Sequence, residues 1–111
     1  MRRFDHRALG RLKSGVMNKT EKRYADYLER QKHLGEILWY KFEGLKFRLA
    51  DKTFYTPDFA VMTSTMQLEA HEVKGFWQDD ARVKIKCAAD LYPIAFKAVK
   101  LKGLQWEVEE F

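Results

Sequence analysis

Residues 55–75 read YTPDFAVMTSTMQLEAHEVKG, and they place charged side chains inside segments that otherwise have the composition of buried strands. Alternate residues of a strand share one face, so Glu72 and Lys74 continue the apolar row that includes Leu68. Asp58 occupies a similar position in the preceding segment. Burying a charged side chain is costly unless it is paired or binds a metal. This stretch therefore indicates both a β-hairpin and a functional site.

The composition favours one folded, unexported domain. The chain has 111 residues and a 46% hydrophobic share, enough for a single core. Cys87 is its one cysteine, which excludes an internal disulfide and a zinc site built from several thiolates. No apolar run approaches the roughly 20 residues of a membrane span. We expect a cytoplasmic protein that has no membrane partner.

The charge is basic and unevenly spread. The formal net charge is +5, and basic side chains crowd the first residues. Such a surface suits a polyanion, because neutralised phosphates release their counterions. We expect residues 1–17 to form a basic N-terminal arm and residues 18–111 to form the single domain. The cations of the arm that we expect to contact DNA are Arg2, Arg3, Arg7, Arg11 and Lys13.

Periodicity and turn residues predict an α/β fold with a mixed sheet flanked by helices. Asn18 and Glu21 form the pattern of a capping box, and Gly35 is a suitable stop for the helix between them. Residues 36–62 predict two or three strands, with 54–62 as one of them. The remaining elements expected are a strand over 66–77, a helix from about 79 to 92, and strands over 94–99 and 104–111.

The predicted hairpin brings two carboxylates together. A turn around Ser64 pairs residue 60 with 68 and residue 58 with 70, which sets Asp58 diagonal to Glu72 at roughly 7–8 Å. Two carboxylates in this arrangement favour a hard divalent cation, Mg²⁺ or Mn²⁺, because the ligands are all oxygens. Lys74 would then lie near the metal, where it can orient or help deprotonate a water, or stabilise a developing phosphate charge.

These residues resemble a known motif. Pro57-Asp58 followed by Glu72-Val73-Lys74 is similar to the PD-(D/E)xK motif of restriction-endonuclease-like nucleases. The resemblance spans about residues 18–99 and includes the order of elements: a helix, then a meander with Asp on its second strand and ExK on its third, then a helix. The chain is most similar to small phage-encoded endonucleases, in which a glycine and aromatics follow ExK and a basic helix comes next.

The resemblance implies a restriction-endonuclease-like core of αβββαβ order and a metal-dependent DNA endonuclease. Asp58 and Glu72 would bind Mg²⁺, with Mn²⁺ as a substitute, and Lys74 would be the catalytic lysine. The Val73 carbonyl and Glu21 would be further ligands. The basic helix would contact DNA through Lys84, Lys86 and Arg82. The chain is small, so we expect structure-selective or weakly sequence-specific cleavage, in the host cytoplasm if a phage encodes it.

Resolvases of this superfamily work as dimers, which implies a possible homodimer. Trp39, Tyr40 and Trp106 are candidates for its interface.

Other interpretations of these residues stay open. The capping box accounts for Glu21 without a metal, and Glu72 with Lys74 can be an ion pair at a sheet edge. Asp58 can be a turn residue after Pro57. Lys84 and Lys86 can belong to a solvated helix face. His71 should face away from Glu72, as a surface residue. A non-catalytic DNA-binding subunit and an RNA-directed nuclease are the alternative functions.

Overall fold

The computed structural model describes residues 15–75 and 79–111. None of the helices in these two ranges is long and apolar enough to cross a membrane. The described elements, in chain order, are α1 (Lys19–His33), β1 (Ile37–Phe42), β2 (Phe47–Ala50), β3 (Thr53–Tyr55), β4 (Phe59–Thr63), β5 (Leu68–Lys74), α2 (Asp79–Leu91), β6 (Ala95–Lys102) and β7 (Gln105–Glu110).

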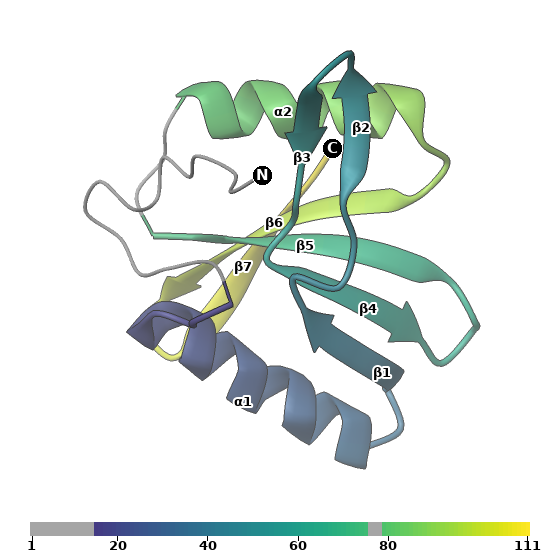
Figure 1. Ribbon diagram of the computed structural model, residues 1–111. Coiled ribbons are helices and arrows are strands. Elements are labelled where there is room, and N and C mark those ends of the chain that lie inside the picture. The colour runs from purple at the N-terminus through teal and green to yellow at the C-terminus, as the bar shows by residue number, and fades with distance from the viewer. Residues whose placement is uncertain (1–14, 76–78) are drawn as a thin grey trace.

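A mixed five-stranded sheet of order β1-β4-β5-β6-β7 forms the middle layer. Its strand pairs are antiparallel except β5 and β6, which run parallel and are joined through α2. Helix α1 covers one face, and α2 with the separate β2–β3 hairpin covers the other (Figure 1). The carboxyl ends of β5 and β6 and the amino ends of both helices lie on the same side of the molecule (Figure 1).

The predicted capping box at the start of α1 is confirmed. The Glu21 N–H donates to Asn18 Oδ1, and the Asn18 N–H donates to Glu21 Oε1; each donor–acceptor distance is 2.8 Å. The helix ends at His33, and Gly35 follows with a φ of 81°, a conformation that glycine adopts without steric cost. Local sequence alone therefore fixes both ends of this helix.

Two buried clusters form the core, one on each face of the sheet. The cluster under α1 contains Tyr24, Leu28, Ile37, Phe59, Val61, Val73 and Val99. The cluster under α2 and the small hairpin contains Phe47, Tyr55, Ala70, Ile85, Ala88 and Phe96. Since both faces of β5 are covered, both alternating rows of its side chains are largely buried.

The prediction of one continuous strand over 54–62 is wrong. Strand β3 ends at Tyr55 in the two-stranded sheet, and β4 begins at Phe59 in the five-stranded sheet, so the described segment between the helices holds five strands. Pro57 is the physical reason, because it has no N–H to donate to a ladder and restricts the residue before it. Asp58 consequently lies in a bend and not in the middle of a strand.

The predicted register of the β4–β5 hairpin is also wrong, by two residues. Ala60 pairs with Ala70 instead of residue 68. The turn is longer than expected: the Thr63 N–H donates to the Gln67 carbonyl, and Met66 takes a positive φ of 67°. One step beyond the last pair, this register sets position 58 opposite position 72 instead of diagonal to it.

The aromatic residues predicted for a dimer interface are largely packed within the molecule. Trp106 stacks edge-on against Tyr24 with ring centroids 4.8 Å apart. The Tyr40 hydroxyl donates to Glu29 over 2.6 Å, whereas Trp39 is 40% exposed. The expected arm lies mostly outside the described residues, although Met17 at its end packs against the core under α1.

Candidate functional site

The bend before β4 ties Asp58 to the backbone of β5. Asp58 is only 2% exposed, and its Oδ2 accepts a hydrogen bond of 2.8 Å from the Val73 N–H. The Glu43 N–H donates to the Asp58 carbonyl oxygen over 2.7 Å, so the turn after β1 supports the bend. Asp58 is thereby held next to Glu72. Glu72 belongs to β5, the central strand of the sheet. A central strand excludes the interpretation of Glu72 and Lys74 as an ion pair at a sheet edge.

Glu21 reaches the same place from α1. It is 4% exposed, and its carboxyl group accepts the capping hydrogen bond from Asn18 and lies close enough to Asp58 to raise the pKa of that carboxyl. The two interpretations of Glu21 are therefore compatible, because one side chain caps the helix and joins the acidic group. We call Glu21, Asp58 and Glu72 the acid cluster.

Tyr55, the last residue of β3, supports the third member of the cluster. Its hydroxyl donates to Glu72 Oε1 over 2.6 Å, and the residue is 6% exposed. Burial, followed by the charge of Glu72, raises the pKa of Tyr55 well above its ordinary value, so the hydroxyl remains a donor at neutral pH. The sequence pattern did not indicate Tyr55 as a site residue, because the pattern does not show where the β2–β3 hairpin packs.

The acid cluster is electrostatically unfavourable for Asp58. Burial, then the negative charges of Glu72 and Glu21, raise the pKa of Asp58 well above its usual range, while the Val73 hydrogen bond acts in the opposite direction. Among the described residues, the charged groups that shift the Asp58 pKa are therefore carboxylates.

The chemistry of the cluster fits a hard divalent cation, because its side-chain ligands are carboxylate oxygens. Within residues 15–75 and 79–111, no three His, Cys, Asp or Glu side chains are placed so that they could hold a metal ion together. The Val73 carbonyl stays a predicted ligand.

Lys74 extends from the end of β5 toward β7. Its Nζ lies 3.4 Å from Glu109 Oε1, and the same carboxylate accepts hydrogen bonds of 3.2 and 2.5 Å from the Arg82 guanidinium of α2. The sequence pattern did not indicate Glu109, which is 35 residues from Lys74. A pocket of about 430 Å³ adjoins this group and is lined by Lys74, Ala98, Lys100, Glu107, Val108 and Glu109.

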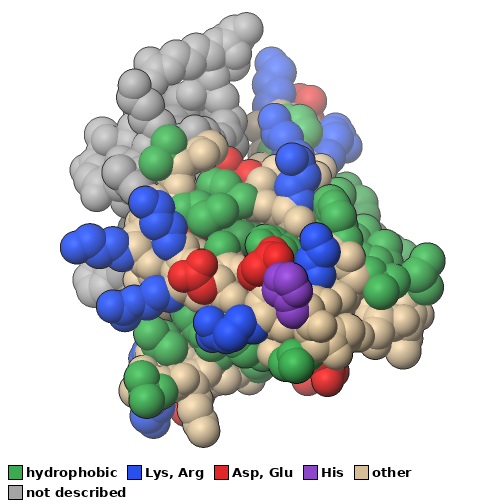
Figure 2. Space-filling model, turned by 90° about the horizontal axis from the view of Figure 1, so that it is seen from below, with side chains coloured by type: hydrophobic (Ala, Val, Ile, Leu, Met, Phe, Trp, Pro, Cys, Tyr) green, Lys and Arg blue, Asp and Glu red, His purple; other side chains and the backbone are tan. Residues whose placement is uncertain are grey.

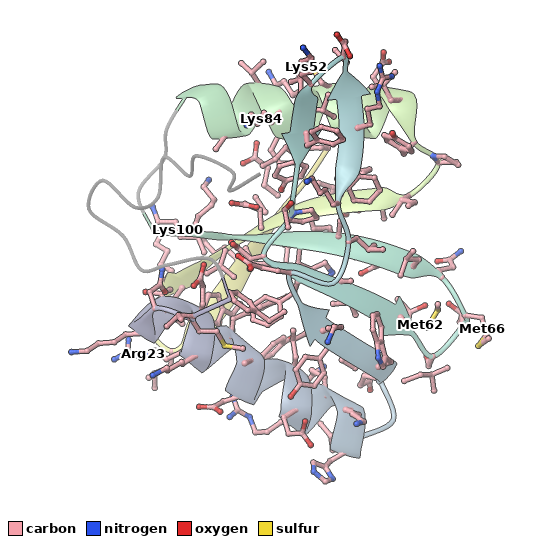
Figure 3. All side chains as sticks on the ribbon, viewed as in Figure 1. Arg23, Lys52, Met62, Met66, Lys84 and Lys100 are labelled. Atoms are coloured by element: carbon pink, nitrogen blue, oxygen red, sulfur yellow. The ribbon has the colours of Figure 1, made fainter. Side chains whose placement is uncertain are left out.

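The predicted DNA contacts are only partly described. On α2, Arg82 is engaged by Glu109, Lys84 is half-buried, and Lys86 is exposed. Figure 3 labels Lys84 on α2, above the sheet, and Lys100 at the left, beside the carboxyl end of β5. The predicted contacts of the arm lie outside the described residues; they are Arg2, Arg3, Arg7, Arg11 and Lys13.

The first two turns of α1 carry a basic group that the sequence pattern did not single out. Lys19, Lys22 and Arg23 are exposed, and none forms an ion pair with a carboxylate of the described chain. Figure 2 shows Lys and Arg side chains gathered on this side of the α1 face, and Figure 3 labels Arg23 there. Cations near a helix amino end oppose the helix dipole, so their placement is unfavourable for the helix alone.

His71 faces away from Glu72 as predicted, but the prediction that it lies on the surface is wrong. It is 7% exposed, with Nδ1 2.6 Å from the Tyr24 hydroxyl and Nε2 2.8 Å from Glu69 Oε1. The Lys97 ammonium lies 3.1 Å from Glu69 Oε2. Helix α1 covers this face of β5, so a row that alternation assigned to solvent forms a buried polar network.

Comparison with known proteins gives no match: no protein-family model, curated protein or solved structure matches the chain. The function must therefore be inferred from the site itself. Its main features are the acid cluster, contributed by α1, the bend before β4, and β5, and a lysine two residues after Glu72.

Proposed function

We propose that this protein is a metal-dependent DNA endonuclease of the restriction-endonuclease-like kind. The observation that carries the proposal is the meeting of Glu21, Asp58 and Glu72, with Lys74 two residues after Glu72 on the same strand. Carboxylates whose charges raise the pKa of a buried neighbour, as Glu72 and Glu21 do at Asp58, destabilise a fold, and proteins retain such strain chiefly where a ligand or a reaction requires it. A divalent cation would relieve the repulsion.

The topology supports a restriction-endonuclease-like core. Helix α1 precedes an antiparallel arrangement of β1, β4 and β5, and α2 follows β5 and leads to the parallel strand β6. Asp58 immediately precedes the second of those strands, and Glu72 and Lys74 close the third. This is the order that the motif resemblance implies, with β2–β3 inserted between the first and second strands.

In this proposal Asp58 and Glu72 hold the cation, with Glu21 and the Val73 carbonyl as further ligands. A bound Mg²⁺ or Mn²⁺ would supply a nucleophilic water at neutral pH and charge stabilisation for the phosphate. Lys74 orients that water or neutralises charge that develops on the phosphate oxygens. Tyr55 holds the Glu72 carboxylate in one orientation through its hydroxyl. The basic residues of α1 and α2 contact DNA phosphates outside the reacting group.

A second function has an observation in its favour. Among the described residues, no three ligand side chains are placed so that they could hold a metal ion together. A non-catalytic DNA-binding subunit would keep the basic surface and tolerate this arrangement. Metal-dependent cleavage separates the two functions, because a binding subunit would retain DNA without cutting it.

The test is cleavage of a labelled panel that includes linear duplex, nicked, flap and four-way-junction DNA and an RNA duplex. Each is incubated with Mg²⁺, with Mn²⁺ and with chelator. We expect cutting with either metal, loss of cutting in Glu72→Gln, slowed but measurable cutting in Lys74→Ala, and wild-type cutting in Asp51→Asn, a control at the tip of the small hairpin. DNA binding without cutting under any condition would support the binding subunit, and preferred cutting of RNA would support an RNA-directed nuclease.

A further inference from the structure

Strand β7 contributes a carboxylate that the proposed function has not used. Glu109 pairs across the sheet with Ala98, and Ala98 pairs with Glu72, so these three residues form one row over β7, β6 and β5. Adjacent strands lie roughly 4.8 Å apart, so the backbones of Glu109 and Glu72, two strands apart, are separated by about 10 Å across the sheet. The small Ala98 side chain between them leaves the space that forms part of the pocket.

Lys74 crosses this space. On β6 its own row continues to Lys100 and on β7 to Glu107. The Lys74 ammonium instead lies 3.4 Å from the carboxylate of Glu109 in the neighbouring row. The Glu107 carboxylate forms an ion pair with the Lys102 ammonium. The direction of the Lys74 side chain therefore follows Glu109 and not the nearest acid in its own row.

Glu109 is itself held in place. Arg82 binds both of its carboxylate oxygens, a forked geometry that fixes the orientation of the carboxylate. The guanidinium also lies 5.3 Å from the centroid of the Phe111 ring, and the Phe111 N–H donates to the Phe96 carbonyl, which anchors the end of β7. Arg82, predicted as a DNA contact, thus has a structural partner on the pocket wall.

We propose that Glu109 is a positioning residue: fixed by Arg82, it holds the Lys74 ammonium at the pocket that Ala98, the strand partner of Glu72, also lines. The inference rests on the proposed function for the role of Lys74. A lysine side chain has four rotatable bonds, so an unrestrained ammonium spends little time in any one place. The distance of 3.4 Å is longer than those to Arg82, so Lys74 is restrained and can still move to a phosphate when DNA arrives.

The first measurement is the single-turnover cleavage rate of wild type, Glu109→Gln, Lys74→Ala and the double variant. Glutamine keeps the shape of the side chain but removes its charge. We expect Glu109→Gln to slow cleavage about 10- to 100-fold without weakening DNA binding, as removal of a supporting partner does. In the Lys74→Ala background the same change should slow cleavage no further, because Glu109 acts through Lys74. An equal effect in both backgrounds would overturn the proposal.

The second measurement does not depend on cleavage. The side-chain order parameter of Lys74, from NMR relaxation of ¹³C-labelled lysine, should fall in Glu109→Gln and stay at the wild-type value in Glu107→Gln, the matched control on the same pocket wall. An unchanged value in Glu109→Gln would overturn the proposal. If the wild type cuts no substrate, the proposed function fails, while the order parameter still decides whether Glu109 positions Lys74.

Discussion

Two buried polar groups lie on opposite faces of β5, and they are built in opposite ways. In the Tyr24–His71–Glu69 network, the side chains of His71 and Lys97 both contact the Glu69 carboxylate. The hydrogen bond to His71 lowers the pKa of Glu69. In the acid cluster, carboxyls face carboxyls and the pKa of Asp58 is raised. Glu69 and Asp58 are both buried, so burial alone does not explain the difference.

The difference separates a structural role from a functional one. His71 Nε2 forms a hydrogen bond with the Glu69 carboxylate and His71 Nδ1 forms one with the Tyr24 hydroxyl, so each polar atom of this chain has a partner. Such a network stabilises the packing of α1 on the sheet. The acid cluster lowers stability in the absence of a cation, and this cost is what a binding site for a divalent cation would show.

The largest expected effect is the loss of cleavage in Asp58→Asn. Asparagine can still accept from the Val73 N–H and can donate to Glu21, so the fold is kept while the negative charge is removed. We expect cleavage to fall by about a thousandfold, roughly 4 kcal/mol of transition-state stabilisation. In chelator the variant should be more stable than wild type by about 0.5–2 kcal/mol. Single-turnover kinetics and urea unfolding measure the two quantities, and cleavage at the wild-type rate would refute the role of Asp58.

Removing a hydrogen bond from the Tyr24–His71–Glu69 network should instead lower stability and leave cleavage unchanged. Tyr24→Phe leaves the buried His71 Nδ1 without the Tyr24 hydroxyl and should lower the free energy of unfolding by about 1–3 kcal/mol. The cleavage rate of the folded variant should not change. Tyr27→Phe is the control, because Tyr27 stacks on Tyr24 but is only partly buried. A large loss of cleavage in Tyr24→Phe at a temperature where it is folded would contradict the separation of the two groups.

The two carboxyls should also give opposite pH dependences of stability in chelator. The lowered pKa of Glu69 means that its contribution is present above about pH 4.3, the unfolded value, and is lost as the pH falls through the folded pKa. The raised pKa of Asp58 means that its protonated form stabilises the fold at low pH, and this is lost as the pH rises from about 3.9 toward the folded pKa.

Urea unfolding from pH 3 to pH 8 checks both signs. The stability of Asp58→Asn relative to wild type should grow with rising pH, and the deficit of Glu69→Gln should shrink as the pH falls below about 4.3. Parallel pH curves for the two variants would show that the two groups do not differ electrostatically.

The smallest expected effect concerns the basic end of α1. Replacing Lys22 and Arg23 by glutamine should weaken DNA binding a few-fold and lower the slope of log K against log salt by about 1 for each phosphate that is no longer neutralised. The catalytic rate at saturating DNA should be unchanged. Lys32→Gln, at the other end of the same helix, is the matched control. The measurement is a salt titration of duplex binding in Ca²⁺ or chelator, and equal slopes for all variants would remove α1 from the DNA-binding surface.

Much of the fold could be predicted because its signals are local. The capping box, Gly35 and the alternation in β5 identify α1 and the strand that carries Glu72 and Lys74. Pro57 also signals a break in the strand, but the alternation of side chains from Phe54 to Met62 favours one continuous strand, and the prediction followed the alternation. The longer turn that ends at Gln67 shifted the hairpin register, and with it the position of Asp58 relative to Glu72.

The contacts that support the site depend on tertiary packing. Tyr55 reaches Glu72 because the small hairpin folds over the sheet, and Glu109 reaches Lys74 from the last strand. Nothing in the local sequence around either residue indicates its partner. The burial of His71 has the same origin, since alternation distinguishes two faces of a strand but cannot show that helices cover both.

The most direct test of the central claim is titration of the wild type and Asp58→Asn with Mn²⁺ in an isothermal calorimeter, at a pH where both are folded. The account predicts saturable binding to the wild type, and binding weakened at least tenfold in Asp58→Asn. Equal binding by the two proteins, or no binding by the wild type, would contradict the claim that the acid cluster is a metal site.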